Sequence, residues 1–469
     1  MADVRLVGLD FGTTTSRCVA ATARLARNAV SGRHELSDVR ECFRSPIVFT
    51  PFADNLLDEG RLEGYLDEWL AATRADGEEI FGGGALITGL AAQQPNSPAL
   101  IKLIRSRLSD ALVATAGDPC LEAWLAFHAN AATLSRDHPD RWVINVDIGG
   151  GTTNIALGKG GEVLRTGSLF VGARHVEVEP GSYRVVELSR YAQALLDHLA
   201  IAAGPGDLLS PQQRDAILDW QLDLLEWALA GNRVQFEQPV AHLHEQVAFN
   251  PLSELREPPM YCLSGGVGEL VYKILRSEPL PGTTQFGDLG IDLAQRIAAN
   301  PRWVARLSGA ALLDCGRATV YGLLLYATQV SGSTVYLPEP NLLPVRDVPI
   351  LGRITSDSTA EQIRDILQLI GPNAVGGCLV VTLTESDASA VRGLGERIGS
   401  ALRTANLPAP LVLLVRENVG KALGSYVSQW GTTPVKLIVL DEIEPLEARF
   451  VQIGKLCNHA VPVSFYGMN

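Results

Sequence analysis

Short apolar runs that end in aspartate and then a glycine-rich turn occur twice along the chain. Residues 4–10 form one such run and residues 142–147 form another, and each predicts a buried strand. A second strand-like run follows each turn, at residues 17–21 and at residues 155–157. Two strands joined by a short Gly/Thr turn form a hairpin. The pattern therefore predicts two similar hairpins, and this self-similarity indicates an internal duplication.

Helical periods and further short strands fill the rest of the first 336 residues. Helices are predicted over residues 61–72, 121–134 and 186–232. Residues 232–259 contain four prolines and little periodicity, which predicts a long surface connection. Strands are expected at residues 84–88, 260–263 and 318–321, the last followed by an apolar helix that ends near residue 331.

Three prolines, Pro338, Pro340 and Pro344, lie close together and indicate a domain boundary. Beyond them, strands and helices alternate, which predicts a small α/β domain. The strands are expected at 379–383, 411–415, 435–440, 449–453 and 460–465, with helices at 386–404 and 419–429. The predicted division is 1–140 for a first half, 141–336 for a second half and 346–469 for a small C-terminal domain.

Composition and charge exclude several classes of protein. The 469 residues are 46% hydrophobic and carry a formal net charge of −13, so the chain is a globular protein that repels nucleic acid and anionic lipid. No apolar run reaches the roughly 18 residues that a membrane helix needs, and no signal-like segment opens the chain. We therefore expect a cytoplasmic protein. The seven cysteines form no Cys-x-x-Cys pair, which argues against a disulfide framework or a zinc ribbon.

The two hairpin turns carry residues suited to polyphosphate. Glycine allows close backbone approach, so that N–H groups can form an anion cradle, and threonine hydroxyls add donors. Asp10 and Asp147 end the preceding strands, and their carboxylates can share one Mg²⁺. One such turn alone is more often structural, but two facing turns can clamp a polyphosphate from both sides. The candidate cradle residues are Gly12, Thr13, Thr14, Thr15, Gly149, Gly150, Gly151, Thr152 and Thr153.

A third glycine-rich segment follows the strand at residues 260–263 and precedes a predicted helix. Without bulky side chains, such a junction can accept a flat adenosine against bare backbone, and the helix N-terminus adds positive potential. A plain tight turn is the simpler alternative. The candidate nucleotide residues in this segment are Gly265, Gly266, Val267 and Gly268.

The order of these three segments resembles the actin-like ATPase superfamily of acetate and sugar kinases, heat-shock 70 chaperones and actin. Its phosphate-1, phosphate-2 and adenosine motifs correspond to residues 10–15, 147–153 and 264–268. The resemblance implies an α/β fold with a duplicated ribonuclease-H-like core and a nucleotide between the halves. It also implies that Glu122, together with Asp10 and Asp147, is catalytic and orients the attacking water or its metal. A solvated glutamate in a first helical turn is an equal alternative for Glu122.

A longer ordered set of motifs covers nearly the whole chain: residues 45–51, 85–89, 146–152, 263–269, 331–334, 420–424 and 461–463. This set resembles the ethanolamine ammonia-lyase reactivating factor family. The resemblance implies an ATP-dependent, chaperone-like factor that uses ATP/ADP and Mg²⁺ and exchanges damaged cobalamin on the lyase for intact adenosylcobalamin. It also implies slow ATP hydrolysis coupled to that exchange. The chain lacks the Asp-x-His-x-x-Gly pattern, so we expect the cobalamin to stay on the lyase.

Departures from the family pattern leave other functions open. Leu90 replaces an acidic residue, and Phe127, Leu323 and Leu324 replace small residues where the two halves are expected to pack. Bulk at that point could alter cleft closure and hydrolysis. A small-molecule kinase of the same superfamily and a nucleotide-binding scaffold without turnover are the alternatives. The identity of the lyase, homodimerisation, association with a bacterial microcompartment and the role of the C-terminal domain stay open.

Overall fold

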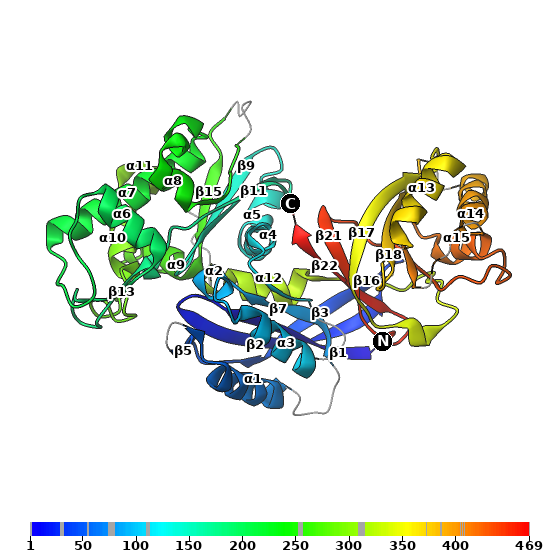
Figure 1. Ribbon diagram of the computed structural model, residues 1–469, viewed down its shortest axis with the longest axis horizontal. Helices are drawn as coiled ribbons and strands as arrows, with labels where there is room; N and C mark the ends of the chain where they lie inside the picture. The colour runs from blue at the N-terminus through cyan, green and yellow to red at the C-terminus, as the bar shows by residue number, and fades with distance from the viewer. Residues whose placement is uncertain are drawn as a thin grey trace.

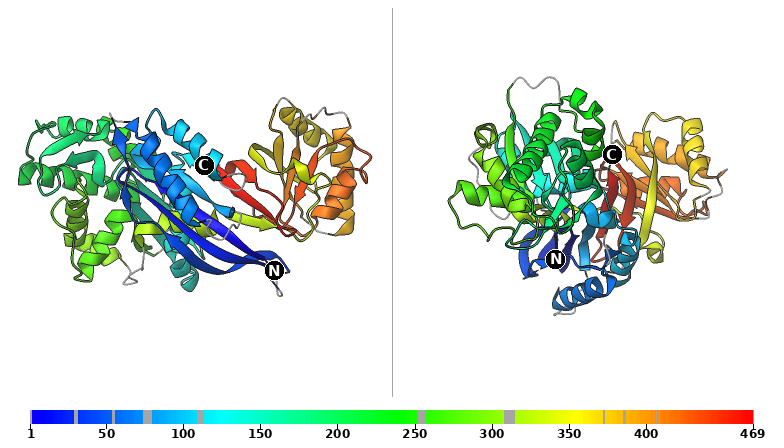
Figure 2. Two further views of the ribbon diagram at one scale, coloured as in Figure 1. Left: turned by 90° about the horizontal axis from the view of Figure 1, so that it is seen from below. Right: turned by 60° about the vertical axis from the view of Figure 1, so that its left-hand side comes forward.

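The computed structural model describes residues 2–28, 32–53, 56–73, 80–108, 113–251, 257–307, 315–371, 373–384, 387–403, 405, 407 and 409–468. Two α/β units lie side by side, and a third, formed largely by the last part of the chain, extends to the right of them in Figure 1. Figure 2 shows the same three units from two further directions. We describe each unit by its sheet, because the sheets position the hairpins.

The first sheet has the strand order β3-β2-β1-β7-β8. Its strands are β1 (Ala2–Phe11), β2 (Thr15–Arg27), β3 (His34–Arg44), β7 (Ile80–Ile87) and β8 (Val113–Ala116). The central strand β1 runs antiparallel to β2 and parallel to β7. Its side chains are buried on both faces, and α1 (Glu59–Thr73) and α3 (Ser97–Leu108) contribute to the core on one of them. Short strands β4 (Val48–Phe49), β5 (Phe52–Ala53) and β6 (Leu56–Leu57) and helix α2 (Gly89–Ala92) complete this unit.

In the second sheet, of order β14-β11-β10-β9-β15, the strands β11-β10-β9-β15 repeat the arrangement of β3-β2-β1-β7, and β14 adds an edge strand beside β11. Its strands are β9 (Trp142–Ile148), β10 (Thr153–Lys159), β11 (Glu162–Leu169), β14 (Glu245–Val247) and β15 (Met260–Ser264). Here β9 runs antiparallel to β10 and parallel to β15, as β1 does with β2 and β7. This strand order and direction define a ribonuclease-H-like sheet, so the predicted duplication is confirmed.

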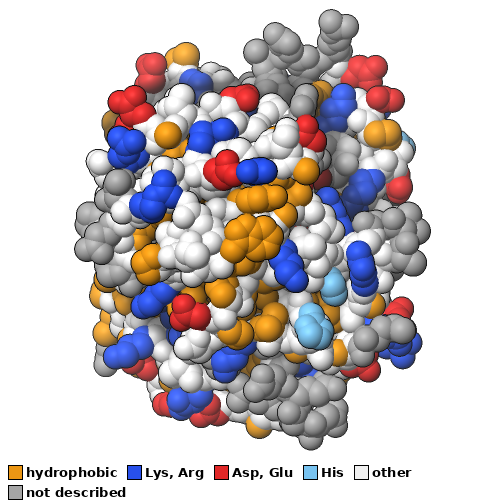
Figure 3. Space-filling model, turned by 90° about the vertical axis from the view of Figure 1, so that its right-hand side faces the viewer, with side chains coloured by type: hydrophobic (Ala, Val, Ile, Leu, Met, Phe, Trp, Pro, Cys, Tyr) orange, Lys and Arg blue, Asp and Glu red, His pale blue; other side chains and the backbone are white. Residues whose placement is uncertain are grey.

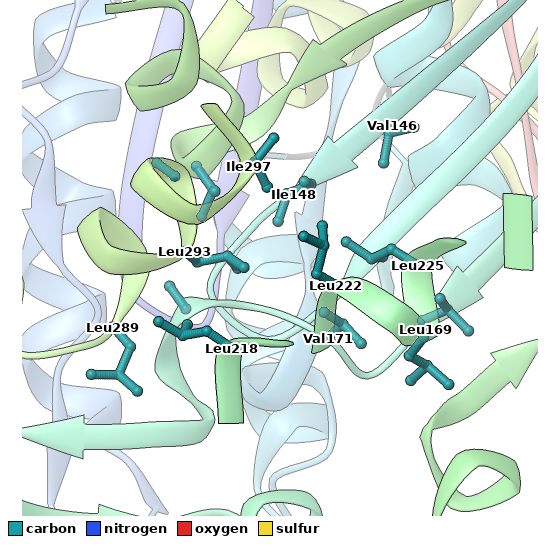
Figure 4. Close-up of a cluster of buried hydrophobic side chains, with 14 of the residues drawn as sticks. Val146, Ile148, Leu169, Val171, Leu218, Leu222, Leu225, Leu289, Leu293 and Ile297 are labelled. Carbon is teal, nitrogen blue, oxygen red and sulfur yellow. The ribbon is translucent and has the colours of Figure 1, made fainter. Parts of the chain in front are cut away.

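Helices cover one face of the second sheet and form its core. Leu218, Leu222 and Leu225 of α7 (Pro211–Leu229) pack against strand residues such as Val146 and Ile148 (Figure 4). Helix α10 (Gly290–Ala299) contributes further apolar side chains to the same cluster. The remaining elements of this unit are α6 (Arg190–His198), α8 (Pro239–His244), α9 (Gly265–Leu275), α11 (Pro301–Arg306), β12 (Val176–Val178) and β13 (Val185–Leu188).

Several sequence expectations in this region were wrong. The stretch 186–232 is not one helix, because residues 199–210 separate α6 from α7. The expected surface connection at 232–259 includes α8 and the edge strand β14. Residues 318–321, expected as a strand, begin α12 (Ala318–Tyr326), and the strand β16 (Thr328–Ser331) lies where a helix was expected. A continuous apolar run of this length fits either a buried helix or a buried strand.

Two helices cross where the two units meet. Helix α4 (Pro119–Asn130), which α5 (Ala132–Asp137) follows, contacts the second sheet, whereas α12 contacts β1, β2 and β7 of the first. The two helices also contact each other. Gly322 on α12 makes this possible, because a Cβ there would lie 2.5 Å from the carbonyl oxygen of Leu125 on α4. Phe127 on α4 likewise fits because Gly158 faces it, where a Cβ would lie 2.4 Å from the Phe127 ring.

The third sheet has the order β16-β22-β21-β17-β18-β19-β20. Its strands after β16 are β17 (Val345–Thr355), β18 (Gly377–Thr382), β19 (Leu411–Val415), β20 (Leu437–Leu440), β21 (Ala448–Ile453) and β22 (Val461–Met468). Helices α13 (Ala360–Ile370), α14 (Ala388–Leu402) and α15 (Gly420–Val427) follow β17, β18 and β19. The sequence predicted the second and third of these strand–helix pairs, but not β17 and α13. Because β16 pairs with β22, the C-terminal sheet begins before residue 336. The division at residues 140, 336 and 346 stays a prediction.

The outer end of this third unit carries exposed apolar side chains. Trp430 is 76% exposed and lies just after α15, and Leu369 near the end of α13 is 62% exposed. Figure 3 faces this end of the molecule and shows hydrophobic side chains between Lys and Arg side chains.

The crossing of α4 and α12 gives a first testable prediction. Gly322→Ala should lower the free energy of unfolding by about 2 kcal/mol, since the added methyl group collides with a backbone carbonyl that cannot move aside. Urea denaturation monitored by circular dichroism measures this change. Gly64→Ala, in an exposed part of α1 with no atom within 4 Å of the added Cβ, is the control and should be neutral or stabilising. Equal midpoints for Gly322→Ala and the wild type would contradict the close crossing.

Candidate functional site

A cavity of about 250 Å³ lies between the first and second units. The strand ends of β1 and β9, the two hairpin turns, the start of α4 and the junction of β15 with α9 all reach it. The predicted site residues that line it are Asp10, Gly12, Thr13, Thr14, Thr15, Glu122, Asp147, Gly149, Gly150, Gly151, Thr152, Gly265, Gly266 and Val267. The structure therefore brings together four segments that are far apart in the sequence.

Two of the nominated residues do not line the cavity. Thr153 is the first residue of β10, is fully buried and donates from Oγ1 to the carbonyl oxygen of Val171 at 2.9 Å. Gly268 lies one turn into α9, where a Cβ would lie 3.1 Å from Cβ of Leu263. Both residues serve the packing behind the cavity.

The two hairpin turns have the same internal geometry. The N–H of Gly12 donates to the carbonyl oxygen of Thr15 at 3.0 Å, and the N–H of Gly149 donates to that of Thr152 at 2.9 Å. These bonds occupy equivalent places after Asp10 and Asp147. The sequence repeat is therefore also a repeat of local structure.

The turns also contact each other directly. A Cβ on Gly150 would lie 2.2 Å from Oγ1 of Thr14, and a Cβ on Gly151 would lie 2.4 Å from Oγ1 of Thr13. Only glycine permits this approach. Oγ1 of Thr13 accepts a hydrogen bond from the N–H of Leu90 at 2.8 Å, so the backbone at Leu90 supports the first turn whatever side chain it carries.

Asp10 is buried at the floor of the cavity. Its carboxylate accepts a hydrogen bond from Oγ1 of Thr88 at 3.3 Å, and Nε of Arg17 lies 3.5 Å from its other oxygen. Burial raises the pKa of Asp10, and the positive charge of Arg17 opposes that rise. Arg17 also donates to the carbonyl oxygen of Gly316, which lines the cavity from the other unit.

Asp147 is held by a chain of buried polar side chains. Oγ of Ser264 donates to its Oδ1 at 2.5 Å, Nδ2 of Asn145 donates to Ser264 at 3.0 Å, and Nδ2 of Asn130 donates to Asn145 at 2.6 Å. Burial raises the pKa of Asp147 to about 6; the bond from Ser264 opposes the rise and the charge of Asp10 adds to it. These polar side chains orient the Asp147 carboxylate, and the Thr319 side chain also hydrogen-bonds to it.

Glu122 is only 4% exposed, so the alternative of a solvated first-turn glutamate is wrong. Nδ2 of Asn154 donates to its Oε2 at 2.8 Å, and Oγ of Ser168 donates to Asn154 at 2.7 Å. Burial raises the pKa of Glu122 well above its usual range, and the negative charge of Asp10 contributes. Asn154 thus fixes a carboxyl group that points into the cavity.

The other end of the cavity is more apolar. Gly265, at φ +79°, begins α9, and a Cβ there would lie 2.4 Å from the carbonyl oxygen of Ile148. Gly266 has open space in front of it. Nζ of Lys273 lies 2.8 Å from Oε1 of Glu269 at the cavity wall. The apolar residues that line this end are Ala173, Val267, Leu270, Pro281 and Phe286.

The donor set fits a nucleotide with a hard cation. Oγ1 of Thr14 is buried and has no hydrogen-bond partner within the described part of the chain, as expected for a donor that awaits an anion. Asp10 and Asp147 supply the oxygen ligands that Mg²⁺ prefers. No group of three or more His, Cys, Asp or Glu residues is placed to hold a metal among the residues described, so a cation here would need phosphate oxygens or waters as well.

Sequence reasoning missed several residues that shape the cavity. Arg17, Thr88 and Asn154 line it, and Ser264 contacts Asp147 from behind. Arg17 and Asn154 each lie seven positions after the aspartate of their hairpin, so alignment of the two repeats would have indicated them. Thr88 and Ser264 lie within the recognised motifs 85–89 and 264–268, but their contacts with Asp10 and Asp147 arise from neighbouring parallel strands and could not be assigned from the motifs.

A second cavity, of about 370 Å³, adjoins the first at Thr13. It also lies between the first two units, and Tyr191 on α6 bridges them there: Nε2 of Gln93 lies 3.1 Å from the Tyr191 hydroxyl. Its other lining residues are Phe52, Leu90, Gln94, Arg174, Glu177, Glu187, Leu188, Ser189 and Arg190.

The duplicated ribonuclease-H-like core, with two glycine hairpins facing across a cavity, is the architecture of the actin-like ATPases. The predicted fold class is therefore confirmed. The chain belongs to the family described as ethanolamine utilisation protein EutA, which matches residues 2–466. Among helices of the described residues, none is both long and apolar enough to cross a membrane.

Two curated relatives are named ethanolamine ammonia-lyase reactivase EutA, from Escherichia coli (strain K12) and Salmonella typhimurium (strain LT2). Each is 30% identical over 457 residues, which covers 96% of this chain and 94% of the relative. Solved structures resemble the chain more weakly. The Aquifex aeolicus PPX-GPPA enzyme is 15% identical with a TM-score of 0.35, covering 61% of this chain and 75% of its own. The ethanolamine utilization protein EutJ from Carboxydothermus hydrogenoformans is 16% identical with a TM-score of 0.28, covering 62% and 90%.

The buried carboxylates lead to a prediction about stability. The pKa of Asp147 is raised in the folded protein to about 6. The free energy of unfolding therefore falls as the pH rises from about 4 through 6, because the folded protein must then hold a buried negative charge. Asp147→Asn should therefore raise the free energy of unfolding of the nucleotide-free protein by about 2 kcal/mol at pH 7.5 and by little at pH 4. Urea denaturation at the two pH values measures the difference. A variant less stable than the wild type at pH 7.5 would show that the buried charge is fully compensated.

Proposed function

We propose that this chain binds Mg-ATP between its first two units and acts as an ATP-dependent, chaperone-like reactivating factor for ethanolamine ammonia-lyase. The observation that carries the nucleotide site is the contact of two glycine hairpins at one cavity, lined by three buried carboxyl groups. The names of the two curated relatives support the lyase as the partner.

Different residues bind the phosphates, the cation and the adenosine. Backbone N–H groups of the two turns and the hydroxyl of Thr14 donate to phosphate oxygens, and Arg17 adds a positive charge. Asp10 and Asp147 hold Mg²⁺, directly or through water. The bare backbone at Gly265 and Gly266 accepts the adenosine, with the apolar wall beside it. When bound, Mg²⁺ supplies positive charge that offsets the carboxylates and the phosphates.

Glu122 is the group that orients water for hydrolysis. Asn154 fixes one of its oxygens, which leaves the other directed at the cavity. A carboxyl group in this position can accept a proton from the water that bonds to the terminal phosphorus as ADP leaves. Hydrolysis then alters contacts in both hairpins, and these belong to different units. The relative position of the units is the signal that the lyase would read during exchange of damaged cobalamin.

Reactivation is the direct test of this function. Lyase inactivated by a damaged cobalamin should recover deamination when mixed with this protein, ATP, Mg²⁺ and intact adenosylcobalamin. Omission of ATP and replacement of the wild type by Asp147→Ala are the controls, and both should fail. No recovery with a cognate lyase would reject the reactivating role.

Nucleotide binding can be tested separately. Asp147→Ala should weaken Mg-ADP by about tenfold or more, because a charged ligand of the cation is lost. Isothermal titration calorimetry measures the Kd, with EDTA in place of Mg²⁺ as a control that should reduce the difference. Unchanged affinity would contradict the assignment of the site.

Glu122→Gln should leave Mg-ADP affinity near that of the wild type and lower the rate of ATP hydrolysis by about a hundredfold. Release of inorganic phosphate under single-turnover conditions measures this rate. If the wild-type protein binds the nucleotide but does not hydrolyse it, the protein is a nucleotide-binding scaffold. If the wild-type protein and Glu122→Gln hydrolyse ATP at the same rate, Glu122 takes no part in the reaction.

A small-molecule kinase is the second candidate, and the second cavity is the observation that favours it. Thr13 lines both cavities, so a ligand in the second would lie near the terminal phosphate of a nucleotide in the first. Phosphate transfer to a metabolite, detected by mass spectrometry, would support this reading. Release of free phosphate alone would support the reactivating factor.

A further inference from the structure

The end of the C-terminal strand β22 is attached to the helix that carries Glu122. Asp118 is the N-cap of α4, and its Oδ1 accepts the N–H of Leu121 at 3.2 Å. Its Oδ2 accepts the N–H of Gly467 at 2.6 Å and that of Met468 at 3.4 Å. One buried carboxylate therefore caps the helix and binds the last strand of the chain. Figure 1 shows the C-terminus beside α4.

Asp118 is also one helical turn from Glu122. The N–H of Glu122 donates to the carbonyl oxygen of Asp118 at 2.9 Å, so a shift of Asp118 moves the first turn of α4 and the Glu122 carboxyl with it. Carboxylates that accept backbone N–H bonds make strong, directional contacts. The position of Glu122 therefore depends on where β22 ends.

Neighbouring side chains strengthen this attachment. Tyr466 on β22 packs with Leu121 and Leu125 of α4, and its hydroxyl donates to Asp347 at the start of β17. The guanidinium of Arg105 on α3 makes two bonds of 2.9 Å to the same Asp347 carboxylate. The C-terminal sheet is thus tied both to the first unit and to the start of α4.

We propose that Asp118 and the end of β22 form a positioning element that sets Glu122 in the cavity, so that the C-terminal domain controls the rate of hydrolysis. This inference rests on the proposed ATPase function and extends it to a region that the nucleotide does not touch. A partner that moves the C-terminal sheet would change hydrolysis through this contact.

Two variants break the contact from opposite sides. Removal of residues 467–469 deletes both N–H donors and leaves Asp118 in place. Asp118→Ser keeps a hydroxyl that can cap Leu121 but is too short to reach β22 as well. Each should lower kcat for ATP hydrolysis by about tenfold, since a misplaced catalytic group costs rate, with the Kd for Mg-ADP within about twofold of the wild type. This split between kcat and Kd would not arise from a general loss of folding.

The double variant supplies the decisive measurement. If both changes act through one contact, the combined loss in kcat should equal the loss from either alone. Asp387→Ser is the matched control, because Asp387 caps α14 through the N–H of Ala390 at 2.7 Å and has no bond to β22 among those described. It should hydrolyse ATP at the wild-type rate.

The possible outcomes distinguish failure of this inference from failure of the proposed ATPase function. The inference is overturned, with the ATPase function left intact, if the truncated protein hydrolyses ATP at the wild-type rate. It is also overturned if the losses in kcat from the two single variants multiply in the double variant. A wild-type chain that binds Mg-ADP but does not turn over ATP would contradict the hydrolysis on which both depend. A wild-type chain that binds no Mg-nucleotide would contradict the proposed site itself.

Discussion

Three carboxyl groups buried around one cavity impose the strongest constraint on this structure. Asp10, Glu122 and Asp147 come from three different elements, and burial raises the pKa of each. Such a cluster is costly unless positive charge or directed hydrogen bonds offset it. Arg17, Thr88, Ser264 and Asn154 provide part of that compensation from within the chain. In the function proposed above, a cation bound with a polyphosphate would provide the remainder.

The same constraint explains why glycine is placed where it is. The carboxylates can share one cavity only if the two hairpins approach closely, and the contacts of Gly150 and Gly151 with Thr14 and Thr13 leave no room for a side chain. For the two hairpins to approach each other, helices α4 and α12 behind them must also pack closely. Gly322 allows α12 to meet α4, and the site and the crossing therefore depend on small residues in separate parts of the chain.

The sequence was informative where structure is local. Both hairpins, the strand–helix junction at Gly265 and the alternating C-terminal elements were predictable because turn chemistry and periodicity lie within a few residues. Thr153 and Gly268 were assigned too broadly, since successive residues of a strand or helix face different sides. The edge strand β14, the helical state of residues 318–321 and the pairing of β16 with β22 depend on distant partners. Arg17 and Asn154 could be found only by comparing the two repeats.

Two bulky residues at the crossing of α4 and α12 have defined packing partners. Phe127 occupies space left by Gly158, so the crossing keeps its close approach despite the larger ring. Leu323 is fully buried with Leu86, Leu121 and Leu125, and Tyr466 of the C-terminal strand belongs to the same cluster. The crossing helices and the C-terminal sheet therefore share one core. Because packed cores resist continuous deformation, a rotation at the crossing must displace Tyr466 or be prevented by it. Leu323 thus packs in the same core as the C-terminal strand β22.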